Sequence, residues 1–228
     1  MQTISPTTVE FLKALSAHNS REWFHANQSF YQQARQEFAA FIAELLKAVD
    51  TFHPLGMIQP KDCIYRQQRD VRFSPDKTPY TTHMSALIAP GGKKTPQVPF
   101  YIRIKPDGVS MLGAGAWGGS APQLYRIRQE IDYNPQPLQA ILHHPDFKQY
   151  FGTLQGESLK RPPKGYAPDH PHLDLLKRKE WYVQHTLTEK EYLRSGGRSE
   201  NFLPYATTVL KAAKPLVDYL NEAWEEEE

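Results

Sequence analysis

The N-terminal part of the chain has apolar residues at helical spacing. Ser5-Pro6 is typical of a helix start with proline in the first turn. Asn19 predicts the end of that helix and the cap of a short following one, with Glu22 completing a capping box. A longer amphipathic helix is expected from about Gln28. The inward positions of these helices are Val9, Leu12 and Leu15, then Tyr31, Ala34, Phe38, Phe41, Leu45 and Val49.

Between residues 60 and 118 the period of the apolar positions changes to two, which is typical of strands. Pro106-Asp107-Gly108 predicts a turn between two of these strands. We therefore expect an antiparallel sheet connected by hairpins, with the N- and C-terminal helices packed on its apolar face. The apolar face has Met84, Ala86, Ile88, Phe100, Ile102 and Ile104, and the opposite face has His83, Tyr101 and Arg103.

The second half of the chain predicts more helices and one more strand. Ser120 can cap a helix that continues to about Ile131, and the glycine-rich run 113–119 before it indicates a bulge or tight turn rather than an anion-binding loop. The further elements are a helix over 137–143, an ordered loop over 152–171, a short helix over 173–176, a strand over 181–187 and a helix over 201–224. The sequence thus predicts an α+β fold, with residues 1–228 forming a single domain.

Composition narrows the class of protein. With 228 residues, of which 39% are hydrophobic and 23% charged, the chain can bury a substantial core and is not a disordered or collagen-like protein. It has no run of about 18 apolar residues and no signal-peptide pattern, and its single cysteine, Cys63, cannot form an internal disulfide. We therefore expect a soluble, cytoplasmic protein without a membrane partner.

The charge is unevenly distributed. Residues 60–120 contain nine Lys and Arg against four Asp and Glu, although the formal net charge of the whole chain is only +2. This local excess favours an anionic partner. The closing run Glu225–Glu228 is most simply a solvated tail.

The candidate chemistry is concentrated in residues 65–83. Ser74-Pro75-Asp76-Lys77 predicts a type I turn, which would make this segment a rigid bend beside the sheet. Arginine suits phosphate or carboxylate because its planar fork donates two parallel hydrogen bonds. The predicted ligand-binding residues are Arg66, Arg69, Arg72, Lys77, Tyr80, His83 and Arg103, with Trp117 as a cover. The alternative is a network in which Asp70 and Asp76 saturate the arginines and pin the loop.

Other side chains suggest chemistry more weakly. His83, Asp70 and Asp76 are candidate catalytic acids or bases, but cationic neighbours should keep both aspartates ionised. Cys63 is expected in the core, before a strand beginning near Ile64, and a nucleophilic pair with His83 is a weaker possibility. The run 169–174 resembles a metal-binding pattern, but a helix capped by Asp169 explains it more simply, so we expect no metal and no cofactor.

The segment Arg69–His83 resembles the hallmark R-D-x-R-F-S-x-D-K-x-P-Y-K-T-H of a bacterial and fungal family, domain of unknown function 2461. This chain has Thr81 where the family pattern has lysine, and Trp117-Gly118-Gly119 where the family usually has Trp-x-Pro. The resemblance implies family membership and no assigned reaction. It extends to Asn19, Glu22, Trp23, Phe24, Trp117, Leu124, Arg128, Ile131, 159–166, 169–171 and 214–216.

The function we expect is binding of a phosphate- or carboxylate-bearing small molecule. One alternative is a hydrolase or phosphoryl-transfer enzyme that uses the same pocket. Another is nucleic-acid binding, to which the exposed cations of 160–164 and 177–179, in particular Lys160, Arg161 and Lys164, would contribute. A scaffold with no small-molecule site is the last alternative. The sequence makes no prediction of oligomeric state.

Overall fold

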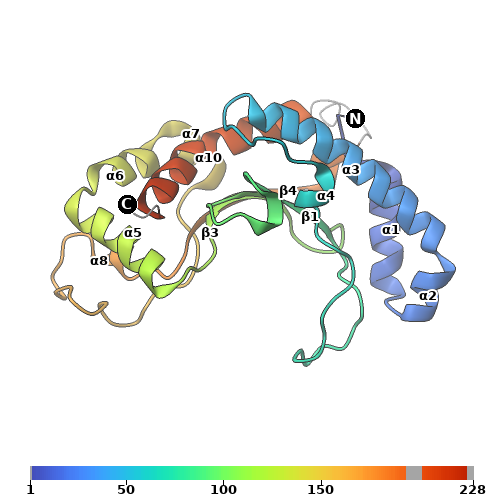
Figure 1. The fold of residues 1–228 in the computed structure, drawn as a ribbon, viewed down its shortest axis with the longest axis horizontal. Coiled ribbons are helices and arrows are strands. Elements are labelled where there is room, and N and C mark those ends of the chain that lie inside the picture. Colours follow the sequence, from blue (N-terminus) through green and yellow to red (C-terminus); the bar gives the residue numbers. More distant parts are fainter. Residues whose placement is uncertain (1, 194–201, 225–228) are drawn as a thin grey trace. The chain divides into compact units, whose positions relative to one another are not determined.

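Helices form the N-terminal part of the chain. In the computed structural model, which describes residues 2–193 and 202–224, they are α1 (Pro6–Ala17), α2 (Arg21–Ala26), α3 (Gln28–Asp50) and α4 (Pro60–Cys63). The side chain of Ser5 caps α1 by accepting a hydrogen bond of 3.1 Å from the backbone N–H of Thr8. α1 and α3 pack side by side through buried side chains such as Phe11 and Phe38 (Figure 1). The predicted helix start at Ser5-Pro6 and the long helix from Gln28 are confirmed.

The strands are β1 (Met84–Ile88), β2 (Phe100–Ile104), β3 (Ser110–Ala116) and β4 (Trp181–Leu187). Within the described residues they form an antiparallel sheet in the order β1-β2-β3-β4. In β2, the apolar positions are fully buried, whereas Tyr101 and Arg103 between them are partly exposed. The predicted alternation of this strand is therefore confirmed, and its polar side chains lie on the side away from the core.

The remaining elements follow the sheet strands or lie between them. They are a 3-10 helix η1 (Gly92–Lys94), α5 (Ala121–Tyr133), α6 (Gln136–His143), α7 (Pro145–Phe151), α8 (Leu173–Leu176), α9 (Glu189–Tyr192) and α10 (Phe202–Trp224). The predicted cap of α5 at Ser120 is confirmed, since its side chain accepts from the backbone N–H of Gln123. The sequence did not predict α4, α7 or α9, which are at most two turns long and carry too few apolar positions to show a period.

The fold class is α+β, as predicted. The chain divides into two compact units, and each is composed of separate stretches of sequence. Unit 1 comprises Met1–Thr95, Tyr101–Leu112 and Thr186–Thr208, and unit 2 comprises Pro96–Phe100, Gly113–His185 and Val209–Glu228. Strands β2, β3 and β4 each have residues in both units. The expectation of a single domain stays a prediction.

Four local predictions are wrong. Ser20, not Asn19, caps α2, because its hydroxyl accepts from the backbone N–H of Trp23. Cys63 is buried as expected, but it ends α4 rather than preceding a strand, and burial raises the pKa of its thiol to about 11. The residue before α8 is His172, which provides no side-chain cap, so Asp169 does not cap this helix. The fourth error is the turn predicted at 74–77: the hydrogen-bonded turn joins the Ser74 N–H to the carbonyl of Val71 at 3.3 Å.

Two other predictions concern the ends of the described ranges. The terminal helix was expected to begin at Asn201, which lies outside the described residues, and α10 is described from Phe202. The run Glu225–Glu228 also lies outside them.

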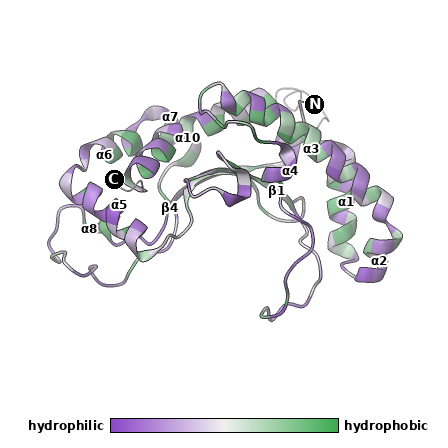
Figure 2. Cartoon of the chain, viewed as in Figure 1, coloured by the Kyte–Doolittle hydropathy of each residue, from purple (hydrophilic) through white to green (hydrophobic). Residues whose placement is uncertain are grey.

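None of the described helices is long and apolar enough to cross a membrane. Figure 2 shows that α1 and α3 each have hydrophobic and hydrophilic sides, whereas the loop between α4 and β1 is mostly hydrophilic.

The glycine-rich end of β3 is explained by close packing within unit 2. Gly115 has a φ of +125°, and a Cβ atom there would collide with the backbone of Trp181 and Tyr182 in β4. A Cβ atom at Gly113 would lie 2.9 Å from the carbonyl oxygen of Val183. Glycine is therefore needed in β3 for the close approach of a neighbouring strand.

Candidate functional site

The segment between α4 and β1 forms a two-stranded ribbon that ends in a long loop. Tyr65 donates its backbone N–H to the carbonyl of Ser85 at 3.0 Å, and Gln68 pairs with Tyr80 in an antiparallel bridge. The Gln67 side chain, which is 3% exposed, donates to the backbone carbonyls of Thr81 and His83 across the ribbon. Beyond this ribbon, residues 70–79 extend as a loop away from the helices of unit 1 (Figure 1).

Arg69 is bonded inside this loop. Its Nη1 donates to Asp76 Oδ2 at 2.5 Å and to the carbonyl and hydroxyl oxygens of Thr78, while Nη2 lies 3.3 Å from Ser74 Oγ. The backbone N–H of Thr78, together with the Arg69 guanidinium, lowers the pKa of the Asp76 carboxyl to about 2. Arg69 and Asp76 thus hold the base of the loop together.

Arg72 and Lys77 are also bonded within the loop. Arg72 forms a two-pronged ion pair with Asp70, with its Nη2 at 2.7 Å from Oδ2 and its Nε at 3.0 Å from Oδ1. This pair lowers the pKa of the Asp70 carboxyl. Lys77 Nζ donates to the carbonyl oxygen of Val71 at 3.0 Å. Asp70 and Asp76 are therefore held ionised, as the sequence indicated, and neither is suited to donate a proton at neutral pH.

Tyr80 ends the loop and is anchored to the N-terminal helices. Its ring is 6% exposed and stacks on Phe24 of α2, with centroids 3.9 Å apart and planes at 11°. The Asn19 side chain accepts from the Tyr80 backbone N–H at 3.1 Å and donates to its carbonyl at 2.9 Å. Asn19 therefore connects the α1–α2 turn to the ribbon instead of capping a helix.

Three other predicted ligand-binding residues lie outside the loop. Arg103 in β2 donates through Nε to the carbonyl of Val109 at 3.0 Å. Trp117 belongs to unit 2 and stacks on Tyr182, with centroids 5.1 Å apart. The third residue, His83, directly precedes β1, where burial and the nearby charges of Arg103 and Lys105 lower the pKa of its imidazole to about 4. The His83 ring is therefore neutral at pH 7, but it is a weak base, because a general base is most effective with a pKa near the working pH.

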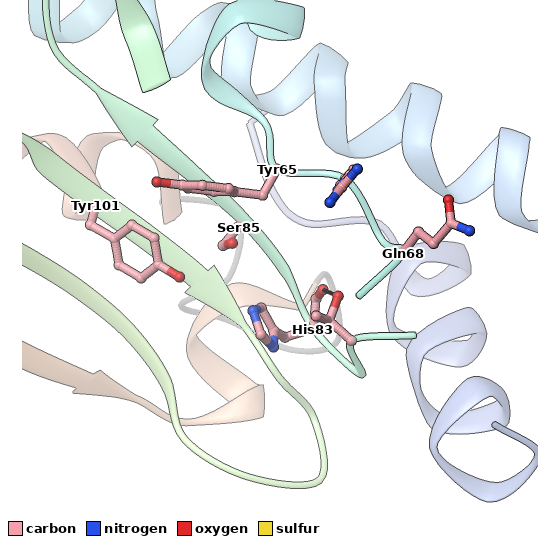
Figure 3. Close-up of a pocket in the computed structure, with 7 residues that line it drawn as sticks. Tyr65, Gln68, His83, Ser85 and Tyr101 are labelled. Atoms are coloured by element: carbon pink, nitrogen blue, oxygen red, sulfur yellow. Dashed lines mark hydrogen bonds between the residues drawn. The ribbon is translucent and has the colours of Figure 1, made fainter. Parts of the chain in front are cut away.

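Two hollows lie beside the ribbon in unit 1. The first, which we call the Arg21 hollow, has a volume of about 470 Å³. The second, the His83 hollow, has a volume of about 360 Å³ (Figure 3). Arg66 and Gln68 line both hollows. The other residues of the Arg21 hollow are Arg21, Phe24, His25, Gln28, Tyr31, Gln67 and Tyr80, and those of the His83 hollow are Tyr65, Thr81, His83, Ser85 and Tyr101.

Arg66 has surroundings unlike those of the loop arginines. Within the described ranges its guanidinium makes no hydrogen bond and no ion pair, although its charge contributes to the lowered pKa of Asp70. Arg21, at the start of α2, likewise makes none with the residues described. The residues that line the two hollows include no Asp and no Glu. The described lining of the Arg21 hollow thus has two cationic forks and no acidic side chain.

Residues 7–219 match the family described as Conserved hypothetical protein (DUF2461). The chain belongs to this family. The matched range contains every residue named above as lining the two hollows, and it confirms the family that the sequence resembled. No curated protein and no solved structure matches the chain.

The structure brings together only part of the predicted site. Of the residues proposed from sequence to hold a ligand, Arg66, Tyr80 and His83 line a hollow. Among the described residues, no group of three or more His, Cys, Asp or Glu could hold a metal ion. In the run 169–174, His170 instead bonds Asp132 at 2.9 Å, and His172 lies 3.3 Å from the side chain of Gln139.

The sequence analysis missed most of the lining residues of the Arg21 hollow. Arg21 and His25 are four residues apart in α2, a spacing that places side chains on one helical face, and Gln28 begins α3. This polar spacing was a usable signal in the sequence. In the His83 hollow, His83 and Ser85 are two residues apart and so share one side of an extended chain.

Proposed function

We propose that the protein binds a small phosphate- or carboxylate-bearing anion in the Arg21 hollow, with Arg66 as the main contact and Arg21 as a second one. The observation that carries this proposal is that the Arg66 guanidinium forms no hydrogen bond or ion pair with the described residues, in a hollow whose described lining includes no acidic side chain. A planar guanidinium donates two parallel hydrogen bonds to a phosphate or carboxylate, so Arg66 still has its full capacity for such a ligand.

The walls of the Arg21 hollow support the same proposal. Gln28 and Gln68 have amide groups that can donate to the remaining anion oxygens. Phe24 and Tyr80 are stacked and buried, so this wall is rigid and apolar. A cation beside an apolar wall attracts an anion more strongly than one fully surrounded by water.

The loop cations support the proposal by contrast. Arg69, Arg72 and Lys77 are bonded to oxygen atoms of their own loop, so an anion there would have to displace those contacts. The geometry gives no comparable support to the catalytic alternative, in which His83 would act as a weak base. Lys160, Arg161 and Lys164 are exposed in the loop before α8, and nucleic-acid binding through them stays a prediction.

The test is isothermal titration calorimetry of the whole protein at pH 7.5 and low salt with inorganic phosphate, citrate and simple phosphate monoesters. We expect at least one of them to bind, and saturation at about 100 times its Kd to stabilise the fold by about 2.7 kcal/mol. Arg66→Gln is expected to weaken this binding by at least about tenfold, since a charge-assisted bidentate pair is lost.

The matched control is Arg72→Gln, because Arg72 is exposed and already paired with Asp70. It is expected to bind the same anion as tightly as the wild-type protein does. The proposal is wrong if no anion in the panel binds, or if the two variants lose the same amount of affinity.

A further inference from the structure

The His83 hollow adjoins the proposed anion site through Arg66 and Gln68, which line both. Its volume of about 360 Å³ falls within the range of about 300 to 1,000 Å³ that is typical of small-molecule pockets. A ligand whose anionic group contacts Arg66 can therefore extend its uncharged part into the His83 hollow.

The lining of the His83 hollow is rich in groups that both donate and accept hydrogen bonds. It has hydroxyl groups from Tyr65, Thr81, Ser85 and Tyr101, together with the amide of Gln68 and the imidazole of His83. The imidazole is neutral above pH 5, so one ring nitrogen donates and the other accepts. Apart from Arg66, this hollow has no charged lining side chain, and its groups match ligand hydroxyls, which also donate and accept.

Ser85 provides the most specific observation. The residue is 3% exposed, and its hydroxyl makes no hydrogen bond with any residue that the structure describes, although it lines the hollow. Figure 3 shows this hydroxyl and the His83 ring on the same side of the strand, with the Tyr101 hydroxyl directed towards them. Because this hydroxyl faces the hollow and is not enclosed by protein atoms, it can bond a polar atom of a ligand there.

The two tyrosine rings add apolar surface to this polar hollow. Tyr65 is 41% exposed and lies above Ser85 in Figure 3, and the ring of Tyr101 lies to the left of Ser85 in the same view. Tyrosine combines a flat apolar ring with a polar hydroxyl, which suits a ligand that has C–H groups and hydroxyl groups on the same small ring. Monosaccharides have this combination.

We propose that the natural ligand is a monosaccharide phosphate whose phosphate lies against Arg66 in the Arg21 hollow and whose hydroxylated ring occupies the His83 hollow. This inference rests on the proposed function, because it uses the same anion contact. It adds a ligand class and a second set of binding residues, of which Ser85 and His83 are the central ones.

The experiment compares inorganic phosphate, a panel of pentose and hexose phosphates, the corresponding free sugars and adenosine monophosphate by calorimetry at pH 7.5. At least one sugar phosphate is expected to bind about tenfold or more tightly than inorganic phosphate, with the free sugars weaker than both. Ser85→Ala is expected to weaken sugar phosphate binding about fivefold, the effect of one hydrogen bond, and to leave inorganic phosphate binding unchanged. Arg66→Gln is expected to weaken both.

Each negative result of this experiment leads to a different conclusion. If inorganic phosphate binds through Arg66 but no sugar phosphate binds more tightly, the ligand class is wrong and the anion site stands. Tighter binding of adenosine monophosphate than of any sugar phosphate also overturns the ligand class. An equal loss of both affinities in Ser85→Ala, in protein whose melting curve is unchanged, shows that the His83 hollow does not hold the sugar. If none of the anions binds, the proposed function fails as well.

Discussion

Arg66 and Arg69 are three residues apart in the chain, yet their guanidinium groups have opposite surroundings. Arg69 is bonded to Asp76, Thr78 and Ser74 within one loop. Arg66 lines two hollows without an acidic side chain and makes no hydrogen bond with the described part of the chain. The same residue type thus stabilises the protein at one position and remains available to a ligand at the other. A local excess of arginine therefore does not by itself locate a binding site.

The ribbon is the reason for this difference. Up to Gln68 the segment is paired with residues 80–85, which holds its side chains beside the sheet and α2. Beyond Arg69 the pairing ends, and the loop satisfies its polar groups with its own side chains. Substitutions at Tyr80, Asn19, His83 and Arg69 test this division between the ribbon and the loop.

Tyr80→Ala is expected to have the largest effect, because Tyr80 joins the loop to the wall of the Arg21 hollow. The substitution removes a buried ring stacked on Phe24, and the free energy of unfolding should fall by about 3 kcal/mol. Urea denaturation measures this change. The control is Tyr133→Ala, since Tyr133 is 90% exposed and its removal should change the free energy by less than about 0.5 kcal/mol. Equal effects of the two variants would contradict the anchoring role.

Asn19→Ala should destabilise the protein by about 2 kcal/mol, because the Tyr80 backbone N–H and carbonyl both lose their partner. Asn19→Asp keeps the acceptor for the N–H and loses the donor to the carbonyl, so its effect on urea denaturation should differ from that of alanine. Asn27→Ala is the matched control, since Asn27 donates only to the nearby carbonyl of Trp23 in α2. An Asn19→Ala protein as stable as the Asn27→Ala protein would show that the connection to the ribbon is unimportant.

The neutral His83 should make stability dependent on pH. Its pKa is lowered to about 4 in the folded protein, against about 6.5 in the unfolded chain, so the unfolded chain binds the proton more readily between these values. Stability is therefore fully present above pH 6.5 and is lost as the pH falls towards 4. The contribution of His83 should be roughly 1–2 kcal/mol, since the ring is partly exposed.

Urea denaturation at pH 7.5 and pH 4.5 tests this dependence in the wild-type protein and in His83→Gln. The variant should lose less stability on acidification. His143→Gln is the control, because His143 is exposed at the end of α6 and should leave the pH dependence unchanged. The prediction fails if the wild-type protein and the His83→Gln variant lose the same stability.

The smallest expected effects on stability distinguish the arginines. Arg69→Gln should increase proteolytic cleavage within residues 70–79 several-fold while the core melts at nearly the same temperature, because the loop loses its contacts to Asp76 and Thr78. Arg66→Gln should change neither cleavage nor melting. Limited proteolysis followed by mass spectrometry compares the two variants. Loop cleavage that rises equally in both would remove the distinction between a structural and a free arginine.

Part of the fold could be predicted because its signals are local. The alternation in residues 100–104 and the apolar stripe of α3 each reflect one element burying one side, and a period along the chain records this directly. The cap at Ser120 is also local, since donor and acceptor are three residues apart. Short helices such as α4 and α9 have no period long enough to detect.

For the candidate site, the sequence predicted the segment of the chain that contains it but not most of the residues that line it. The cationic segment 65–83 was identified, and Arg66, Tyr80 and His83 within it line hollows. Asn19 was read as a cap because its real partner, Tyr80, is 61 residues away. Similarly, Arg21 and Ser85 reach the hollows through packing between distant segments, for which a single sequence has no direct signal.

The α+β class, the family and the segment in which cations gather could all be inferred from the sequence. These properties depend on the order of residue types along the chain and on hydrogen bonds between near neighbours. Which guanidinium groups bond within the fold and which face a hollow became visible in three dimensions alone. That outcome depends on where Asp70, Asp76 and the carbonyl oxygens of the loop lie in space, because a hydrogen bond forms only within about 3 Å of its partner.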